Sequence, residues 1–223
     1  FDSGINRLGI GPEQMSQCRL HDLDIDLLLS HLASADEDSA QNNAQQRLFN
    51  EHAAASGAKR LSLANSAGIM LGADYHYGLT RPGLSLYGGI ARSGMEAFIK
   101  PVARLSARLL QVRALPAGAP IGYNATHICG NDTTVGTISM GYADGYLRAF
   151  SSKGTAHHGA ASLPVLGRVS MDLVTIDISA APELREGDWV EVEYDLPTAS
   201  ALTGLSQYEL LTNLGTRFER IWR

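Results

Sequence analysis

The spacing of apolar residues in the first ninety positions predicts strands and helices that follow one another. Residues 25–30 contain three consecutive leucines and predict a buried strand that ends at His31. Residues 39–55 are rich in good helix formers and are followed by Gly57, a common stop signal, so they predict a helix. The residues expected near the apolar face of this helix are Ala44, Leu48 and Ala53.

Shorter patterns complete this part of the chain. Pro12 suits the first turn of a helix, expected to continue from Glu13 to Cys18, because proline loses no hydrogen bond at that position. Residues 61–64 and 83–87 are short apolar runs bounded by turn or polar residues, and each predicts a strand. Repeated strand and helix units of this kind are typical of a parallel β/α architecture.

After about residue 92 the pattern changes to alternation with a period of two. Apolar residues alternate with polar ones over residues 174–178 and again over residues 190–194. This alternation indicates strands with one buried face, in a mainly antiparallel β structure. One helix is predicted near the end, where Ser206 and Glu209 form a capping box and Gly215 is expected to stop it.

We therefore predict two domains, with a boundary near residues 90–97. Residues 1–92 form a partial β/α domain, and residues 93–223 form a β domain. The fold class expected from this change of pattern is α/β followed by mainly antiparallel β.

The charge balance excludes some classes of partner. The 223 residues include 18 Lys and Arg against 23 Asp and Glu, a formal net charge of −5. A footprint on nucleic acid needs clustered positive charge, so we expect no nucleic-acid partner. The longest apolar runs are a few residues, far short of the roughly 18 to 20 residues that cross a membrane. We expect a soluble protein with no membrane partner.

The cysteines, the paired histidines and the first residue each allow a limited inference. Cys18 and Cys129 fit neither a disulfide framework nor a metal-ligand spacing, which favours a reducing compartment. His157 and His158 lack further ligands at metal spacing, so we expect them in a solvated loop and predict no metal site. The chain begins at Phe1, directly in a motif-like run, and resembles the C-terminal piece of a longer protein.

Four polar positions fall where a parallel β/α domain carries its chemistry, at the carboxyl ends of strands. They are Arg7, His31, the pair Asn65-Ser66 and Arg81. Each has an ordinary alternative: a strand-end histidine, a capping turn, or surface arginines in ion pairs. The Asn65-Ser66 turn could also start a helix whose free N–H groups favour a phosphate. Their recurrence at the same kind of position in successive units supports a joint site, and the ordinary alternatives stay open.

In the β half the irregular polar segments are residues 122–124, 141–146 and 167–172. Tyr142 and Tyr146 could serve a site or could simply be packing aromatics. Asp144-Gly145 is a turn signal under either interpretation.

Taken in order, these segments resemble the PLP-dependent alanine racemase family over nearly the whole chain. The matching motifs are residues 2–9 (Asp2 to Gly9), 31–37 (His31 to Glu37), Asn65-Ser66, 81–88 (Arg81 to Gly88), Gly122-Tyr123, 141–145 (Gly141 to Gly145) and 167–172 (Gly167 to Asp172). The resemblance implies the second part of a TIM-type β/α barrel followed by a β domain, in a head-to-tail homodimer with shared active sites. It also implies a small amino acid as substrate and pyridoxal 5'-phosphate as cofactor.

The resemblance further implies roles for residues of the first domain. His31 would lie against the pyridine ring, Arg7 would reach the ring hydroxyl and the substrate carboxylate, and Arg81 would donate to the ring nitrogen. Because arginine does not give up its proton, that nitrogen is expected to stay unprotonated, which suppresses side reactions such as transamination. The residues expected to hold the phosphate are Ser66, Gly83 and Leu84.

Racemisation needs one base on each face of the α-carbon, since a proton leaves from one side and returns on the other. The resemblance implies that Tyr123 is one base, contributed to the partner subunit's site, where Met171 and Asp172 also bind substrate. A lysine that forms the cofactor aldimine would serve the opposite face. The residues that match the substrate entryway are Asp36, Tyr142, Arg148 and Arg168.

The chain departs from the family in its lysines, near its C-terminus, and between Arg7 and His31, where the segment is shorter than usual for the family. None of its three lysines, Lys59, Lys100 and Lys153, lies in the family's lysine motif, so this chain alone is expected to be inactive and its first domain poorly stable. Thr216 stands where many members carry a tyrosine, which puts a phosphate or gate contact in doubt.

Two alternatives to alanine racemisation stay open. They are a racemase of the same fold for serine, lysine or several amino acids, and a non-catalytic PLP-binding or dimerisation remnant. Cytoplasmic location and supply of D-alanine for the bacterial cell wall are expectations from the family.

Overall fold

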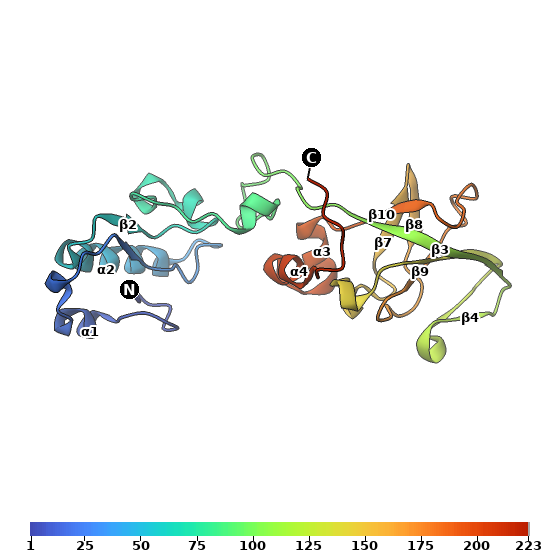
Figure 1. Ribbon diagram of the computed structural model, residues 1–223, viewed down its shortest axis with the longest axis horizontal. Coiled ribbons are helices and arrows are strands. Elements are labelled where there is room, and N and C mark those ends of the chain that lie inside the picture. Colours follow the sequence, from blue (N-terminus) through green and yellow to red (C-terminus); the bar gives the residue numbers. More distant parts are fainter. Residues whose placement is uncertain (223) are drawn as a thin grey trace. The chain divides into compact units, whose positions relative to one another are not determined.

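The computed structural model describes residues 1–222, apart from the side chain of His21. The chain divides into two compact units, unit 1 from Phe1 to Lys100 and unit 2 from Pro101 to the C-terminal end (Figure 1). Each unit has its own apolar core, and the two are described separately. Among the described residues, no helix has the length and apolar character needed to span a membrane.

Unit 1 is a short β/α arrangement. Its helices and strands are α1 (Pro12–Gln17), β1 (Leu27–Leu29), α2 (Ala40–Ser56) and β2 (Arg60–Ser62), with 3₁₀ helices at Leu20–Asp22, Gly68–Leu71, Ala73–Tyr75 and Leu84–Tyr87. β1 and β2 pair in parallel, with Leu28 opposite Leu61, and α2 connects them (Figure 1). This is the parallel β/α unit that the sequence predicts, and it forms part of a barrel.

Helix α2 begins and ends where its sequence indicates, but its buried face is only partly the expected one. Ser39 Oγ accepts the N–H of Gln41 (3.2 Å), and Gly57 adopts a left-handed φ of 66°. Of the residues expected on the apolar face, Ala44 is exposed, Leu48 is half-buried, and Ala53 packs against the core of unit 1. The buried residues of α2 are Asn42, Gln45, Phe49 and Ser56. Two amide side chains thus occupy core-facing positions, where they reach backbone groups of neighbouring segments.

The strand predicted over residues 83–87 is also wrong. That run forms the 3₁₀ helix Leu84–Tyr87, which Gly88 closes with a left-handed φ of 83°. The extended pairing lies just before it, where Arg81 forms a parallel bridge with Asn65 and donates its backbone N–H to the carbonyl of Ala64 (2.9 Å). A four-residue apolar run does not by itself distinguish a strand from a short helix.

Unit 2 is built on one antiparallel sheet, as predicted. The strands run in the order β8-β7-β10-β3-β6-β9 and every pairing between them is antiparallel (Figure 1). Their bounds are β3 (Leu105–Leu115), β6 (Thr133–Ile138), β7 (Thr155–His158), β8 (Ala161–Pro164), β9 (Val174–Asp177) and β10 (Trp189–Val192). The strands β4 (Pro120–Ile121) and β5 (His127–Ile128) form a separate small hairpin.

Two local expectations in unit 2 need correction. His157 and His158 lie in strand β7 and not in a loop, with His157 hydrogen-bonded to Glu193 (3.2 Å). Helix α4 (Gln207–Asn213) has the predicted capping box, but it ends at Leu214 with extended backbone instead of at Gly215. The helix α3 (Leu196–Thr203) precedes it, capped by the carboxylate of Asp195.

The core of unit 2 includes one of the two loop tyrosines. Tyr146 is fully buried and its ring stacks on Phe150 at a centroid distance of 4.3 Å. Burial raises the pKa of the Tyr146 hydroxyl well above its usual range. Tyr146 is therefore a packing aromatic, whereas Tyr142 is only partly buried.

Candidate active site

The loop that carries Arg7 is shaped by one carboxylate. Asp2 Oδ1 accepts the backbone N–H groups of Gly4 (2.9 Å), Ile5 (3.0 Å) and Asn6 (3.1 Å), and Oδ2 accepts that of Arg7 (3.1 Å). These bonds hold the pKa of Asp2 below its usual value, because they favour the charged form. The sequence thus turns sharply after Asp2 and presents the Arg7 side chain at the surface.

His31 follows strand β1, as predicted, and is partly buried. Its pKa is lowered from 6.5, first by burial and then by the positive charges of Arg81 and Arg7. The charges of two arginines that are far away in the sequence therefore act on His31. The imidazole is neutral near pH 7, with a flat face suited to an aromatic ring.

Arg81 reaches across the ends of both strands. Its Nη2 donates to the carbonyl oxygens of Ser30 (2.6 Å) and Leu63 (3.4 Å), and its Nη1 donates to Ser62 Oγ. Burial lowers the pKa of the guanidinium, although an arginine remains charged in proteins. The group is thus held at the carboxyl edge of the two-stranded sheet by backbone and hydroxyl acceptors.

The hydroxyl of Ser66 is the centre of a small cluster of polar groups. Ser66 is almost fully buried, and its Oγ accepts the backbone N–H groups of Gly83 (3.0 Å) and Ser85 (3.3 Å). Within the part of the chain that the structure describes, the buried Oγ of Ser85 has no hydrogen-bond partner. The turn before it is capped by Asn65, whose Oδ1 accepts the N–H of Gly68 (2.9 Å). Hydroxyls and backbone N–H groups gathered in this way can bind an anion.

In unit 2, Tyr123 begins a short helical turn between β4 and β5. Gly122, Asn124 and Ala125 all have positive φ values of 72°, 60° and 48°. A non-glycine residue in this region of backbone conformation is strained, so the turn is an unusual one. The Tyr123 side chain is 65% exposed.

The other loops of unit 2 are bonded to one another. The N–H groups of Tyr142 and Ala143 donate to the carbonyl oxygens of Ser170 (3.0 Å) and Met171 (2.9 Å). A side chain at Gly141 would collide with the Met171 carbonyl, so glycine is required for this close approach. The loops 141–146 and 167–172 thus behave as one structural piece.

An arginine from the C-terminal segment bridges the two loops. Arg217 Nε lies 3.1 Å from Asp144 Oδ1, and Nη1 donates to Asp172 Oδ1 at 2.6 Å. Asp144 is buried, and its second oxygen accepts the N–H of Gly141 (2.9 Å). Both aspartates raise the pKa of Arg217, which stays protonated. Arg217 therefore orients the carboxylate of Asp172.

The remaining predicted residues fall on exposed surfaces of their own units. Arg148 lies over the ring of Tyr142, 5.0 Å from its centroid, in a cation–π contact. Arg168 is exposed in the loop that carries Met171 and Asp172, and Asp36 is exposed in the segment after His31. Unit 1 thus brings together Arg7, His31 and Arg81, and unit 2 gathers its candidates on adjoining loops.

The sequence reasoning missed three residues that support these groups. Asp2 and Arg217 orient loops through charge-assisted hydrogen bonds, and Gln45 bonds to the backbone on both sides of the residue after His31. The available signal for Gln45 was helical spacing, because it lies four residues before Phe49 on the same face. No local signal marked Arg217, whose partners lie far away in the sequence.

Comparison with known proteins identifies the family. Residues 1–91 match the family model described as alanine racemase, N-terminal domain, and residues 102–222 match alanine racemase, C-terminal domain. A catabolic alanine racemase of Agrobacterium fabrum is 40% identical over 231 residues, covering 99% of this chain and 60% of the relative. An alanine racemase of Cereibacter sphaeroides is 41% identical, covering 99% of this chain and 63% of the relative.

A solved structure is similar in fold as well. The alanine racemase of Bartonella henselae with covalently bound pyridoxal phosphate superposes with a TM-score of 0.88 at 34% identity. The match covers 99% of this chain and 64% of that one. The chain therefore spans a little under two thirds of the length of these similar proteins.

Proposed function

The chain belongs to the alanine racemase family, and from this premise we propose that it is the larger part of an enzyme that interconverts L-alanine and D-alanine. The observation that carries the proposal is the position of Arg81, whose Nη2 donates to the carbonyl of Ser30 (2.6 Å), the residue before His31, and whose backbone bridges to Asn65, the residue before Ser66. We further propose a cytoplasmic homodimer with shared active sites.

The polar groups of unit 1 fit pyridoxal 5'-phosphate. Ser66, Gly83 and Leu84 would hold the phosphate, and the unpartnered Oγ of Ser85 supports a polar ligand there. The cofactor, when bound, supplies an electron sink for the substrate α-carbon. Arg81 would donate to the ring nitrogen and keep it unprotonated, because a guanidinium does not release its proton.

His31 and Arg7 would act on the ring and the substrate. The lowered pKa of His31 supports a neutral imidazole packed against the pyridine face. Arg7 would attract the ring hydroxyl and the substrate carboxylate, and the Asp2 carboxylate holds the backbone that positions it.

Tyr123 would move the proton on one face of the α-carbon, in the site of the partner subunit. Its exposed side chain, on a strained turn, supports a role outside its own unit. Met171 and Asp172 would contact substrate in that same site, with Arg217 holding the Asp172 carboxylate. Asp36, Tyr142, Arg148 and Arg168 would line the entryway.

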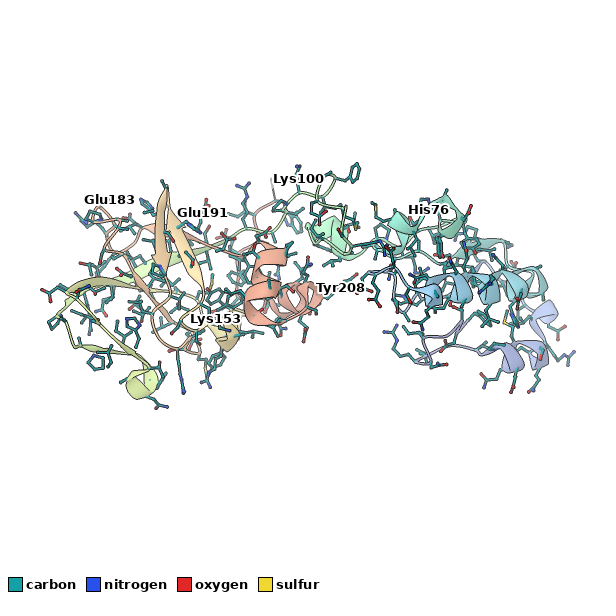
Figure 2. The ribbon with its side chains drawn as sticks, turned by 180° about the vertical axis from the view of Figure 1, so that it is seen from behind. His76, Lys100, Lys153, Glu183, Glu191 and Tyr208 are labelled. Carbon is teal, nitrogen blue, oxygen red and sulfur yellow. The ribbon has the colours of Figure 1, made fainter. Side chains whose placement is uncertain are left out.

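The base on the other face is expected to be a lysine outside these 223 residues. Lys59 stands at the amino end of β2, away from the site, and its Nζ lies 2.7 Å from a carboxylate oxygen of Asp24. Lys153 belongs to unit 2 (Figure 2), where its Nζ donates to the carbonyl of Leu202 at 3.4 Å. Lys100 is exposed at the last position of unit 1. We therefore expect residues 1–223 alone not to racemise alanine.

Two physiological roles for this racemisation are supported. The family expectation is supply of D-alanine for peptidoglycan. The relatives named catabolic favour a second candidate, racemisation of alanine for its breakdown. Deletion of the gene distinguishes them: a requirement for added D-alanine supports the first, and loss of growth on one enantiomer of alanine as carbon source supports the second.

Substitution of Tyr123 tests the activity. The experiment uses the complete polypeptide, defined as the product of the whole reading frame that contains these residues, with chiral detection of alanine, serine and lysine. Tyr123→Phe should lower alanine racemisation by about 10²- to 10⁴-fold, the usual contribution of a proton-transferring group. Tyr208→Phe removes the same hydroxyl from an exposed tyrosine of α4 and should leave the rate unchanged (Figure 2). An unchanged rate in Tyr123→Phe refutes the assigned role.

A further inference from the structure

Gln45 has an unusual place for a glutamine, because it is only 1% exposed on the inner face of α2. Its Oε1 accepts the N–H of Ala33 (2.8 Å). Its Nε2 donates to the carbonyl oxygen of His31 (2.9 Å) and to Ser3 Oγ (3.2 Å). The side chain thus provides hydrogen-bond partners for the backbone groups on both sides of Leu32. It does so from a helix of 17 residues.

The hydrogen bonds continue from Gln45 to Arg81 through two buried serines. The hydroxyls of Ser3 and Ser30 are 2.6 Å apart, and the carbonyl of Ser30 accepts Nη2 of Arg81 at 2.6 Å. Ser3 is 3% exposed and Ser30 is 1% exposed. Water therefore has little access to this chain of bonds, and each missing partner would leave a buried polar group unsatisfied.

The same bonds reach all three segments that carry the proposed cofactor residues. Ser3 belongs to the segment that leads to Arg7, Gln45 fixes the backbone at His31, and Ser30 accepts the guanidinium of Arg81. A buried amide is costly unless all its groups are bonded, and an apolar side chain of similar size would fill the same space. The neighbouring buried Asn42 differs, because its side-chain N–H groups donate to the carbonyls of Ser34 and Glu37, both after His31 in its own segment. These bonds do not link that segment to those of Arg7 and Arg81.

We propose that Gln45 is a positioning residue that sets the orientation of His31 and, through Ser3 and Ser30, the direction of the Arg81 guanidinium. This inference rests on the proposed function, in which His31 and Arg81 contact the pyridine ring. Gln45 itself touches no reacting atom. Its hydrogen bonds hold the imidazole of His31 and the guanidinium of Arg81 in one orientation, as hydrogen bonds behind the ligand-contacting residues do in other binding sites.

The test compares two glutamines of the same helix in the complete polypeptide. Gln45→Met keeps the length of the side chain and removes its polar groups. Gln46→Met is the matched control, since Gln46 donates to the carbonyl of Asp74 (2.8 Å) and hydrogen-bonds to the side chain of Tyr77, and both partners lie outside this network. The readouts are the dissociation constant for pyridoxal phosphate, the ¹⁵N resonance of its ring nitrogen, and thermal unfolding.

Gln45→Met should weaken pyridoxal phosphate binding by roughly tenfold or more, the effect of unsatisfied buried groups, and it should move the ¹⁵N resonance. Gln46→Met should change neither. Ser3→Ala is a milder variant that breaks the link to Arg81 while leaving α2 intact, and it should also move the resonance. If Gln45→Met does not fold, Ser3→Ala provides the test.

The possible results separate the two proposals. Wild-type protein that binds no pyridoxal phosphate would refute the proposed function and the inference together. If the wild-type protein binds the cofactor while Gln45→Met and Ser3→Ala keep its affinity and its ¹⁵N resonance, the positioning role alone is overturned. A lower unfolding temperature with an unmoved resonance also overturns it, because Gln45 would then serve stability only.

Discussion

The two units bury different kinds of side chain. Among the described residues, seven of the eight buried polar residues belong to unit 1, and Asp144 represents unit 2. Those of unit 1 are Ser3, Ser30, Asn42, Gln45, Ser56, Ser62 and Ser66. Polar groups in an interior must be hydrogen-bonded, and in unit 1 several of the bonds lead to the candidate site residues. The interior of unit 1 therefore holds the candidate site residues in place through hydrogen bonds, whereas the interior of unit 2 is mainly apolar.

The apolar cores of the two units also differ in size. The main cluster of unit 2 contains 22 buried residues on a six-stranded sheet, whereas that of unit 1 contains nine, beside two strands of three residues each. Burying one large aliphatic side chain contributes about 1.5 to 3 kcal/mol. Isolated two-stranded sheets are marginal, while three or more strands with an apolar face are stable. Unit 2 should therefore fold by itself more readily than unit 1.

The largest expected effect follows when the units are produced separately. Residues 101–223 should unfold in one cooperative thermal transition, and residues 1–100 should give none, because their small core cannot offset the chain entropy. Circular dichroism and amide hydrogen exchange on both pieces provide the measurement, each piece serving as the control for the other. A cooperative transition in residues 1–100 would contradict the comparison.

A smaller effect is expected at the bridge across the loops of unit 2. Arg217→Gln in the complete polypeptide should raise KM for alanine about two- to fivefold, the range of a partly exposed ion pair, with little change in kcat. The reason is that the Asp172 carboxylate loses its orienting partner. Arg185→Gln is the control, since the guanidinium of Arg185 donates to the nearby backbone carbonyls of Pro182 and Leu184. Equal KM values in the two variants would remove Arg217 from the site.

The smallest effect concerns the charge around His31. Its pKa in the folded protein should lie below 6.5. As the pH falls, the imidazole of the unfolded chain is therefore protonated before that of the folded chain. The free energy of unfolding of unit 1 should decrease as the pH falls from about 6.5 to the lowered pKa. Arg7→Gln should raise the pKa of His31, because one of the positive charges that lower it is removed. NMR titration of the imidazole in the complete polypeptide measures this. Arg60→Gln, which removes a charge paired with Asp26, should leave the titration unchanged.

The local sequence predicted a helix or strand correctly where the residues of that element determine its bounds. Helix α2 begins after Ser39 and ends at Gly57 because a side-chain cap and a left-handed glycine act within one turn. The alternation over residues 174–178 likewise specifies a strand with one buried face. By contrast, the run 83–87 and the buried face of α2 were misjudged, since their partners lie in other segments.

The sequence by itself determined the order of motifs, the β/α and β halves, and the identity of the candidate residues on each strand end. Only the tertiary structure decided what supports them: the carboxylate of Asp2 under the Arg7 loop, Gln45 between His31 and the serines, and Arg217 across two loops. The physical reason is range. Caps and periodicity act over a few residues, whereas a buried hydrogen bond joins groups that folding alone brings together, and nothing in the local pattern of either partner records the other.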